Sequence, residues 1–99
     1  MSTSSPLAGL DPVLTAPKRL AITAFLAAST STDFAVLRDH LSISDSDLSK
    51  QVSALEQAGY VEVSKNGRGR GSTTSFRITK AGRAAFDHHR RTLRALLDD

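Results

Sequence analysis

Residues 44–61 read Ser-Asp-Ser-Asp-Leu-Ser-Lys-Gln-Val-Ser-Ala-Leu-Glu-Gln-Ala-Gly-Tyr-Val, and this stretch decides the fold. Ser44 is a favoured helix N-cap residue, and the acidic Asp47 three positions later completes the signature of a capping box. Apolar side chains then recur at helical spacing, at Leu48, Val52 and Leu55. Gly59 supplies a helix stop. The stretch therefore predicts a helix over about 44–58 that buries one narrow apolar side.

A β-hairpin is predicted after this helix. Residues 60–65 alternate between apolar and polar side chains, which is typical of a strand. Residues 73–78 have the same character, with Phe76 and Ile78 on one side. Between them, Asn-Gly-Arg-Gly-Arg-Gly at 66–71 cannot bury anything and has great backbone freedom, so we expect it to form an exposed tip.

Three more helices are predicted around this unit. The first spans 17–29 and has a broad apolar side, and the second spans Phe34–Leu41. The last follows the N-cap residue Thr79 and runs to about Leu97. Residues 29–33 form a polar connection with room for a short extended piece. The order helix, helix, helix, hairpin, helix predicts a mainly α fold with a small β-hairpin (α+β), the layout of a winged helix-turn-helix.

The length of 99 residues allows one domain, because so short a chain cannot cover two separate cores. We expect residues 1–9, which are rich in serine and small residues, to form a flexible tail, and residues 10–97 to form the domain. Within the domain, Leu10–Leu14 is predicted to start a short helix with Asp11 as its cap.

Cysteine is absent from the sequence, which excludes disulfides and thiolate chemistry. No apolar run approaches the ~20 residues of a membrane span, and the first residues do not form a secretory signal. We therefore expect a cytoplasmic protein with no membrane partner.

Positive charge is concentrated in one part of the chain. The formal net charge is +3, but residues 63–86 hold six Lys and Arg residues and no acid. Such a block is either an ordinary solvated surface or a surface that faces phosphates. The second interpretation is favoured because alternating arginine and glycine lets guanidinium groups approach phosphate oxygens or a narrow minor groove. We predict nucleic-acid contacts at Lys65, Arg68 and Arg70, with Arg77 and Arg38 as further neighbours of phosphates.

The 44–58 helix is small and polar on the side opposite its apolar residues. A major groove can admit such a side, and its hydroxyl and ammonium groups can bond phosphates or base edges. We predict DNA contacts at Ser46, Ser49, Lys50 and Ser53. The alternative is a solvated helix side, and the three acids of this helix weigh against phosphate contacts. Asp45 and Asp47 either serve only the helix N-terminus, or Asp45 accepts a hydrogen bond from a cytosine amino group.

A longer pattern of residues extends over these elements. It comprises Phe34, Leu37, Leu41, Ile43, Ser44, Leu48, Val52, Leu55, Gly59, Tyr60, Val61, the Gly/Arg loop, Phe76, Ile78, Thr79, Gly82 and Phe86. This pattern resembles the winged-helix transcriptional regulators of the MarR/ArsR-like group over roughly residues 10–97. The resemblance implies a homodimer that binds double-stranded DNA, with the 44–58 helix in the major groove and residues 65–73 on the backbone or in the minor groove. Ser42 departs from the pattern, which frequently has glycine there, and Ser46-Asp47 stands where Gly-Asn is common.

The last helix ends in several leucines. A chain this small has few other apolar side chains left against which these leucines could pack. Its apolar line resembles a coiled-coil seam. We predict a twofold dimer interface at Leu10, Val13, Leu14, Phe86, His89, Leu93, Leu96 and Leu97. The alternative is that these side chains fold back onto the first helix. A dimer would place two recognition helices about 34 Å apart, which matches successive major grooves.

Other classes of function have little support in the sequence. His88 and His89 are adjacent on a helix and diverge by about 100°, so they do not converge on a metal ion. No nucleophile is arranged with a base and no nucleotide-binding loop is present, so we expect neither an enzyme nor a cofactor. No convergent polar cluster marks an effector pocket. A winged helix can also serve as a protein-interaction module without specific DNA binding, and the acids of the 44–58 helix keep that alternative open.

Overall fold

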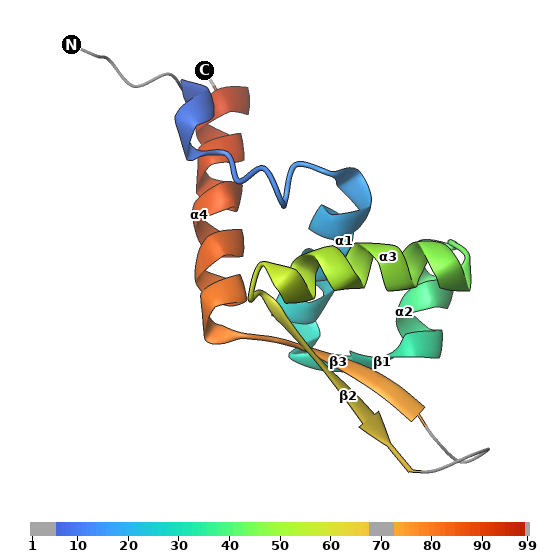
Figure 1. Ribbon diagram of the computed structural model, residues 1–99. Helices are drawn as coiled ribbons and strands as arrows, with labels where there is room; N and C mark the ends of the chain where they lie inside the picture. The colour runs from blue at the N-terminus through green and yellow to red at the C-terminus, as the bar shows by residue number, and fades with distance from the viewer. Residues whose placement is uncertain (1–5, 68–72, 99) are drawn as a thin grey trace.

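The computed structural model describes residues 6–67 and 73–98, which form four helices, a short 3-10 turn and a small sheet (Figure 1). In chain order the elements are η1 (Pro6–Gly9), α1 (Pro17–Ser29), β1 (Ser31–Asp33), α2 (Phe34–Leu41), α3 (Asp45–Gln57), β2 (Val61–Asn66), β3 (Thr73–Ile78) and α4 (Lys80–Leu97). The first three helices pack together above the sheet, while α4 stands along one side and extends beyond them. The predicted α+β winged helix-turn-helix fold is confirmed.

The sheet is antiparallel with the strand order β1-β3-β2. Val61 pairs with Ile78 and Val63 with Phe76, so their side chains share the face that packs on the helices. Glu62 pairs with Arg77 on the opposite face. The three-residue strand β1 is the short extended piece for which the polar connection at residues 29–33 leaves room.

The hydrophobic core joins all the layers of the molecule. Its buried members are Leu14, Ile22, Leu26, Leu37, Leu48, Val52, Leu55, Val61, Phe76 and Ile78. The predicted apolar side of α3 is therefore the side that enters the core, and the rest of this helix faces outward. Phe34 and Phe76 extend the core towards the hairpin, with ring centroids 5.9 Å apart.

Side-chain caps begin three of the helices. Asp33 accepts from the backbone N–H of Val36, and Thr79 accepts from that of Gly82, each at 2.9 Å. Ser44 accepts from the backbone N–H of Asp47 at 3.1 Å, as the capping-box signature predicts. In a full capping box the Asp47 carboxylate would accept from the backbone N–H of Ser44. Here this carboxylate bonds Lys18 and Gln51 instead.

The N-terminal part of the chain differs from the sequence prediction. Within the expected tail, residues 6–9 form η1 and pack on α4. The stretch around Asp11 is a turn and not a helix: Leu14 and Thr15 donate to the Asp11 carbonyl, each at 3.0 Å. Pro17 explains why this turn does not continue as a helix into α1. It disfavours the helical conformation at Ala16, whose φ and ψ are −69° and 126°. None of the helices described is long and apolar enough to cross a membrane.

Candidate nucleic-acid interface

Helix α3 and the β2–β3 hairpin border a common groove of about 650 Å³. The groove is lined by Phe34, Ser49, Val52, Ser53, Glu56, Val63, Lys65, Thr74 and Phe76. Lys65 pairs with Thr74 beyond the last core pair of the sheet, which directs the lysine towards the α3 side. The fold thus brings Ser49 and Ser53 of the helix and Lys65 of the hairpin to the same side of the molecule.

The predicted contact residues of α3 all lie in solvent. Ser46, Ser49, Lys50 and Ser53 are exposed, and Leu48, Val52 and Leu55 are buried on the other side. The exposed surface has short hydroxyl side chains and one ammonium group. It can donate and accept hydrogen bonds without bulky side chains that would hold a duplex away.

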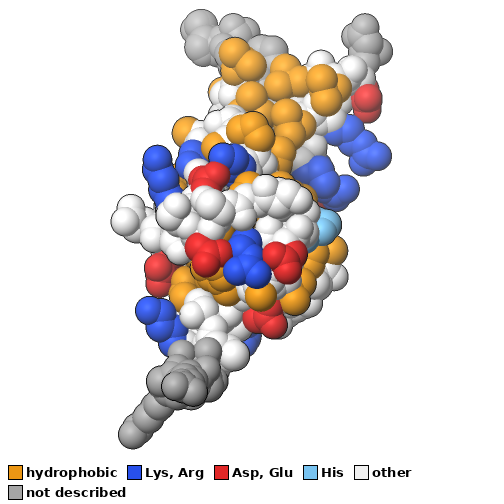
Figure 2. All heavy atoms as spheres, turned by 90° about the vertical axis from the view of Figure 1, so that its right-hand side faces the viewer, with side chains coloured by type: hydrophobic (Ala, Val, Ile, Leu, Met, Phe, Trp, Pro, Cys, Tyr) orange, Lys and Arg blue, Asp and Glu red, His pale blue; other side chains and the backbone are white. Residues whose placement is uncertain are grey.

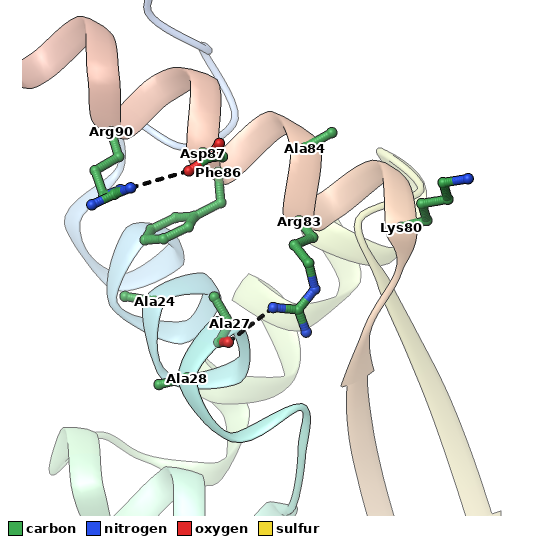
Figure 3. Close-up of a pocket in the computed structure, with 9 residues that line it drawn as sticks. All are labelled: Ala24, Ala27, Ala28, Lys80, Arg83, Ala84, Phe86, Asp87 and Arg90. Carbon is green, nitrogen blue, oxygen red and sulfur yellow. Dashed lines mark hydrogen bonds and ion pairs between the residues drawn. The ribbon is translucent and has the colours of Figure 1, made fainter.

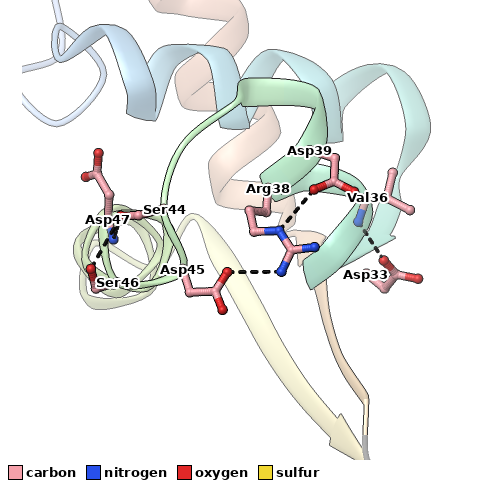
Figure 4. A network of polar contacts seen from close by, with 8 residues as sticks. All are labelled: Asp33, Val36, Arg38, Asp39, Ser44, Asp45, Ser46 and Asp47. Carbon is pink, nitrogen blue, oxygen red and sulfur yellow. Dashed lines mark hydrogen bonds and ion pairs between the residues drawn. The ribbon is translucent and has the colours of Figure 1, made fainter.

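Two of the three acids of α3 are neutralised by cations from neighbouring helices. The Asp45 carboxylate accepts from Arg38 Nη1 at 3.0 Å (Figure 4). Asp47 forms an ion pair with Lys18 and accepts from Gln51 Nε2 at 2.9 Å. The bond from Gln51, followed by that from Lys18, holds the pKa of Asp47 below its ordinary value. Acidic and basic side chains consequently alternate across the middle of the face in Figure 2.

The other predicted cationic contacts divide into four groups. Arg68 and Arg70 lie outside the described residues. Arg77 is exposed, but on the sheet face turned away from the groove, where it lies opposite Glu62 in the strand register. Arg38 is held by carboxylates, since its Nε also donates to Asp39 Oδ1 at 3.0 Å. Lys65 is the predicted hairpin contact that the structure places in the groove.

Glu56 also lines the groove and was not predicted as part of the site. Its side chain is exposed at the end of α3 nearer β2. A carboxylate there can accept from a base amino group and repels phosphates. Helical projection could have found it, because Ser49, Ser53 and Glu56 are spaced by four and three residues.

The turn at residues 10–16, which we call the N-terminal strap, connects α4 with the other helices. His89 Nδ1 accepts from the backbone N–H of Asp11 at 2.9 Å, and Tyr60 donates its hydroxyl to Asp11 Oδ2 at 2.5 Å. This bond to Asp11, with burial as a smaller cause, raises the pKa of Tyr60 to about 12. Arg19 donates from Nε to the Val13 carbonyl at 2.7 Å and from Nη1 to Gln51 Oε1 at 3.1 Å. The strap is therefore bonded to α4, to the start of β2 and, through Arg19, to α3.

These contacts correct two members of the predicted dimer interface. His89 is 1% exposed and Leu14 is fully buried, so both are packed inside one chain. Val13 and Phe86 are partly buried and also pack against the core. These four residues therefore pack within their own chain, against the core or, for His89, against the backbone of Asp11.

A terminal apolar patch remains at the far end of α4. Its members are Leu7, Leu10, Leu93, Leu96 and Leu97, of which Leu7 is 63% and Leu97 80% exposed. Hydrophobic side chains gather over this end of the molecule in Figure 2. In Figure 1 the C-terminal end of α4, which carries the patch, extends away from α3 and from the hairpin.

A second hollow of about 650 Å³ lies between α1 and α4 (Figure 3). Ala24, Ala27 and Phe86 contribute its apolar lining. Arg83 crosses it and donates from Nη1 to the Ala27 carbonyl at 3.0 Å. Arg90 donates to Asp87 at 3.1 Å, and this bond is the main cause that holds the pKa of Asp87 below its ordinary value. Both arginines are thus bonded within the chain, and Arg83 ties α4 to the end of α1.

Metal chemistry finds no support in the described part of the chain, where no three His, Asp or Glu side chains are grouped to hold an ion. His88 is exposed and His89 is buried with Asp11 as its partner. The prediction that these adjacent histidines diverge agrees with this arrangement.

Comparison with known proteins gives one family and several similar folds. Residues 18–97 match the family model of the winged helix DNA-binding domain. No curated protein matches the chain. A solved transcriptional regulator homologue from Pyrococcus horikoshii OT3 has 27% sequence identity and a TM-score of 0.82, over 87% of this chain and 85% of its own.

Two further structures show similarity of fold at lower identity. YusO from Bacillus subtilis has 18% identity and a TM-score of 0.73, over 82% of this chain and 57% of its own. A mutant MarR from E. coli, solved in complex with operator DNA, has 16% identity and a TM-score of 0.68, over 78% of this chain and 54% of its own. The chain spans little more than half the length of these two proteins, and its predicted resemblance in fold to MarR-type regulators is confirmed.

Proposed function

The chain belongs to the family of winged helix DNA-binding domains, and on this premise we propose that it regulates transcription as a homodimer on a near-palindromic DNA site. Helix α3 enters the major groove and the β2–β3 hairpin follows the backbone or the minor groove. The observation that carries the proposal is the groove shared by α3 and the hairpin, because one duplex can touch both elements only if they face the same side.

Within this proposal, the exposed side of α3 reads the bases. Ser49 and Ser53 line the groove, and Ser46 and Lys50 are exposed next to them. Short hydroxyls lie close to base edges, whereas Lys50 reaches either a base edge or a phosphate. Pairing of Asp45 and Asp47 with Arg38 and Lys18 supports this role, since it removes much of the repulsion that these acids would exert on phosphates.

The hairpin supplies contacts that do not depend on sequence. Lys65 is exposed in the groove, and Arg68 and Arg70 follow it in the chain. Each phosphate neutralised by such a side chain releases counterions and makes binding more sensitive to salt. Arg77 is left out of these contacts because it faces away from the groove.

The terminal apolar patch supplies the twofold contact. Its leucines are exposed or partly buried in one chain, and a second copy of the patch would cover them. Pairing of two chains through the C-terminal end of α4 and η1 leaves the α3 grooves uncovered, because that end of α4 extends away from α3 and from the hairpin. Such a dimer would present two recognition helices about 34 Å apart.

A gel shift with mixed genomic fragments at low salt tests DNA binding, and selection of the bound fragments yields an operator. Replacing Arg68 and Arg70 by Ala should weaken binding to all sequences and reduce the slope of log K against log salt by about 0.9 for each phosphate that is no longer neutralised. Replacing Arg94 by Ala, at the exposed end of α4, is the control with the same loss of charge per residue.

Base reading by α3 has a different signature. Ser49→Ala or Lys50→Ala should reduce binding to the selected operator more than binding to random DNA. Equal losses on both kinds of DNA would make these residues backbone contacts. Binding to no duplex at low salt would overturn the proposal and favour a protein-interaction module, the alternative that the acids of α3 keep open.

A further inference from the structure

Arg38 lies at the junction of α2 and α3 and is held by two carboxylates (Figure 4). Its Nε donates to Asp39 Oδ1 and its Nη1 donates to Asp45 Oδ1, both at 3.0 Å. The two carboxyl side chains are 72% and 69% exposed, whereas that of Arg38 is 34% exposed. The guanidinium is therefore the inner member of a triad whose acids face solvent.

The triad adjoins the proposed DNA-reading surface. Asp45 is the first residue of α3, and the exposed Ser46 follows it directly. The connection between the helices is short and fixed, with Ser42 in the left-handed conformation and its N–H bonded to the Asp39 carbonyl at 3.3 Å. The position of Arg38 relative to the start of α3 is thus set by backbone as well as by charge.

We propose that Asp45 restrains Arg38 and thereby lowers affinity for DNA of any sequence, an inference that rests on the DNA binding proposed above. A phosphate that takes the Nη1 donor must displace the Asp45 carboxylate from it. This exchange replaces one charge-assisted hydrogen bond by another, so it contributes little free energy of binding, and the displaced carboxylate repels the phosphate.

The restraint acts on every duplex alike, because phosphates carry no sequence information. A contact withheld from both operator and random DNA lowers both affinities by the same factor and leaves their ratio unaltered. Phosphate contacts provide essentially all of the affinity for random DNA, so random DNA reports the restraint most directly.

Because of Asp39, the restraint by Asp45 can be removed without releasing the Arg38 side chain from its position. If Asp45 loses its charge, Asp39 still holds Nε and keeps Arg38 at the junction. Asp47 plays no part, because its partners are Lys18 and Gln51. A change at Asp45 alone thus releases one face of the guanidinium.

The test measures affinity for a short mixed-sequence duplex over a salt series, with wild type, Asp45→Asn, Arg38→Gln and the double variant. Asp45→Asn should bind about twofold to fivefold more tightly, the scale of one exposed ion pair, with a salt slope steeper by about 0.9. In the Arg38→Gln background, Asp45→Asn should give a smaller gain and leave the slope unchanged.

Asp33→Asn is the matched control, because Asp33 also begins a helix, carries the same charge and bonds the backbone of Val36 instead of Arg38. Asparagine is an equally good cap, so this variant should remain folded. An equal gain in both single variants, or an Asp45→Asn gain that is as large without Arg38 as with it, would overturn the restraint while leaving DNA binding intact. A wild-type chain that binds no duplex would overturn both proposals.

Discussion

Gly82 lies in the first turn of α4, where its α-carbon faces the backbone of Tyr60. A β-carbon at this position would lie 2.2 Å from the Tyr60 carbonyl oxygen. That oxygen is fixed, because it accepts from the backbone N–H of Thr79 at 3.0 Å. The glycine thus lets the start of α4 approach the turn between α3 and β2.

Gly82→Ala should lower the free energy of unfolding by about 2–3 kcal/mol, at the upper end of the range for overpacking, since a backbone group must move. Chemical denaturation measures the effect. The neighbouring exposed Ala81→Gly should cost only about 1 kcal/mol, the difference in helix propensity. Helix propensity alone would make Gly82→Ala more stable by about 1 kcal/mol, so a gain in this variant would show that the close approach does not explain the glycine.

Ser42 has a positive φ of 55° at the end of α2, where the winged-helix regulators that the sequence resembles frequently have glycine. An L-residue in this conformation is strained, and glycine is not. Ser42→Gly should therefore raise the free energy of unfolding by about 0.5–1 kcal/mol. The same exchange inside α3, Ser46→Gly, should lower it, so thermal unfolding of the pair separates the effect of conformation from that of composition.

At the scale of elements, the strap and the start of β2 are joined by the bond from Tyr60 to Asp11. The pKa of Tyr60 is raised from its ordinary 10.0 to about 12, because the neutral hydroxyl donates to a carboxylate. A raised folded-state pKa means that the stabilisation is complete below pH 10 and is lost as the pH rises through about 12.

Between pH 10 and about pH 12, the free energy of unfolding should fall more for the wild type than for Tyr60→Phe. Tyr60 is the only tyrosine and tryptophan is absent, so phenolate absorbance reports this one group. Asp11→Asn should move the absorbance midpoint back towards 10.0. A wild-type midpoint that already lies there would contradict the bond.

The elements of the winged core could be predicted because their signals are local. Helical spacing located α1 to α4, and Thr79 and Ser44 marked two of their beginnings. The strap could not be predicted in the same way, because its shape depends on partners distant in the chain. Tyr60 is 49 and His89 is 78 residues from Asp11.

The same distinction between local spacing and distant partners explains which parts of the candidate site could be predicted. Exposure of Ser46, Ser49, Lys50 and Ser53 follows from helical spacing around Leu48 and Val52, and the structure agrees. Engagement of Arg38 by Asp45 does not follow from spacing, because the two residues lie on different helices. His89 was misassigned for a related reason: an apolar helix side does not reveal which neighbours cover it.

At the scale of the whole molecule, the terminal apolar patch predicts the oligomeric state. Leu97→Glu should raise the dimer dissociation constant by about 100-fold, because each copy loses about 1.5 kcal/mol of apolar burial. Analytical ultracentrifugation over a concentration series measures the change. Ala84→Glu, at an exposed position of the same helix, should leave the constant unaltered.

A wild-type chain that sediments as a monomer at micromolar concentration would remove the twofold contact from the proposed function. DNA binding by a single winged helix would remain to be tested on its own, because the α3 groove is complete within one chain.

The strap is a hydrogen-bonded link between α4 and the reading helix α3. Asp11 bonds His89 of α4 and Tyr60, and Arg19 connects the strap to Gln51 of α3. In a pair of chains joined at their α4 ends, a change in the angle between the two copies would tilt both reading helices at once. The spacing of half-sites on a duplex would then be governed at the end of the protein farthest from it.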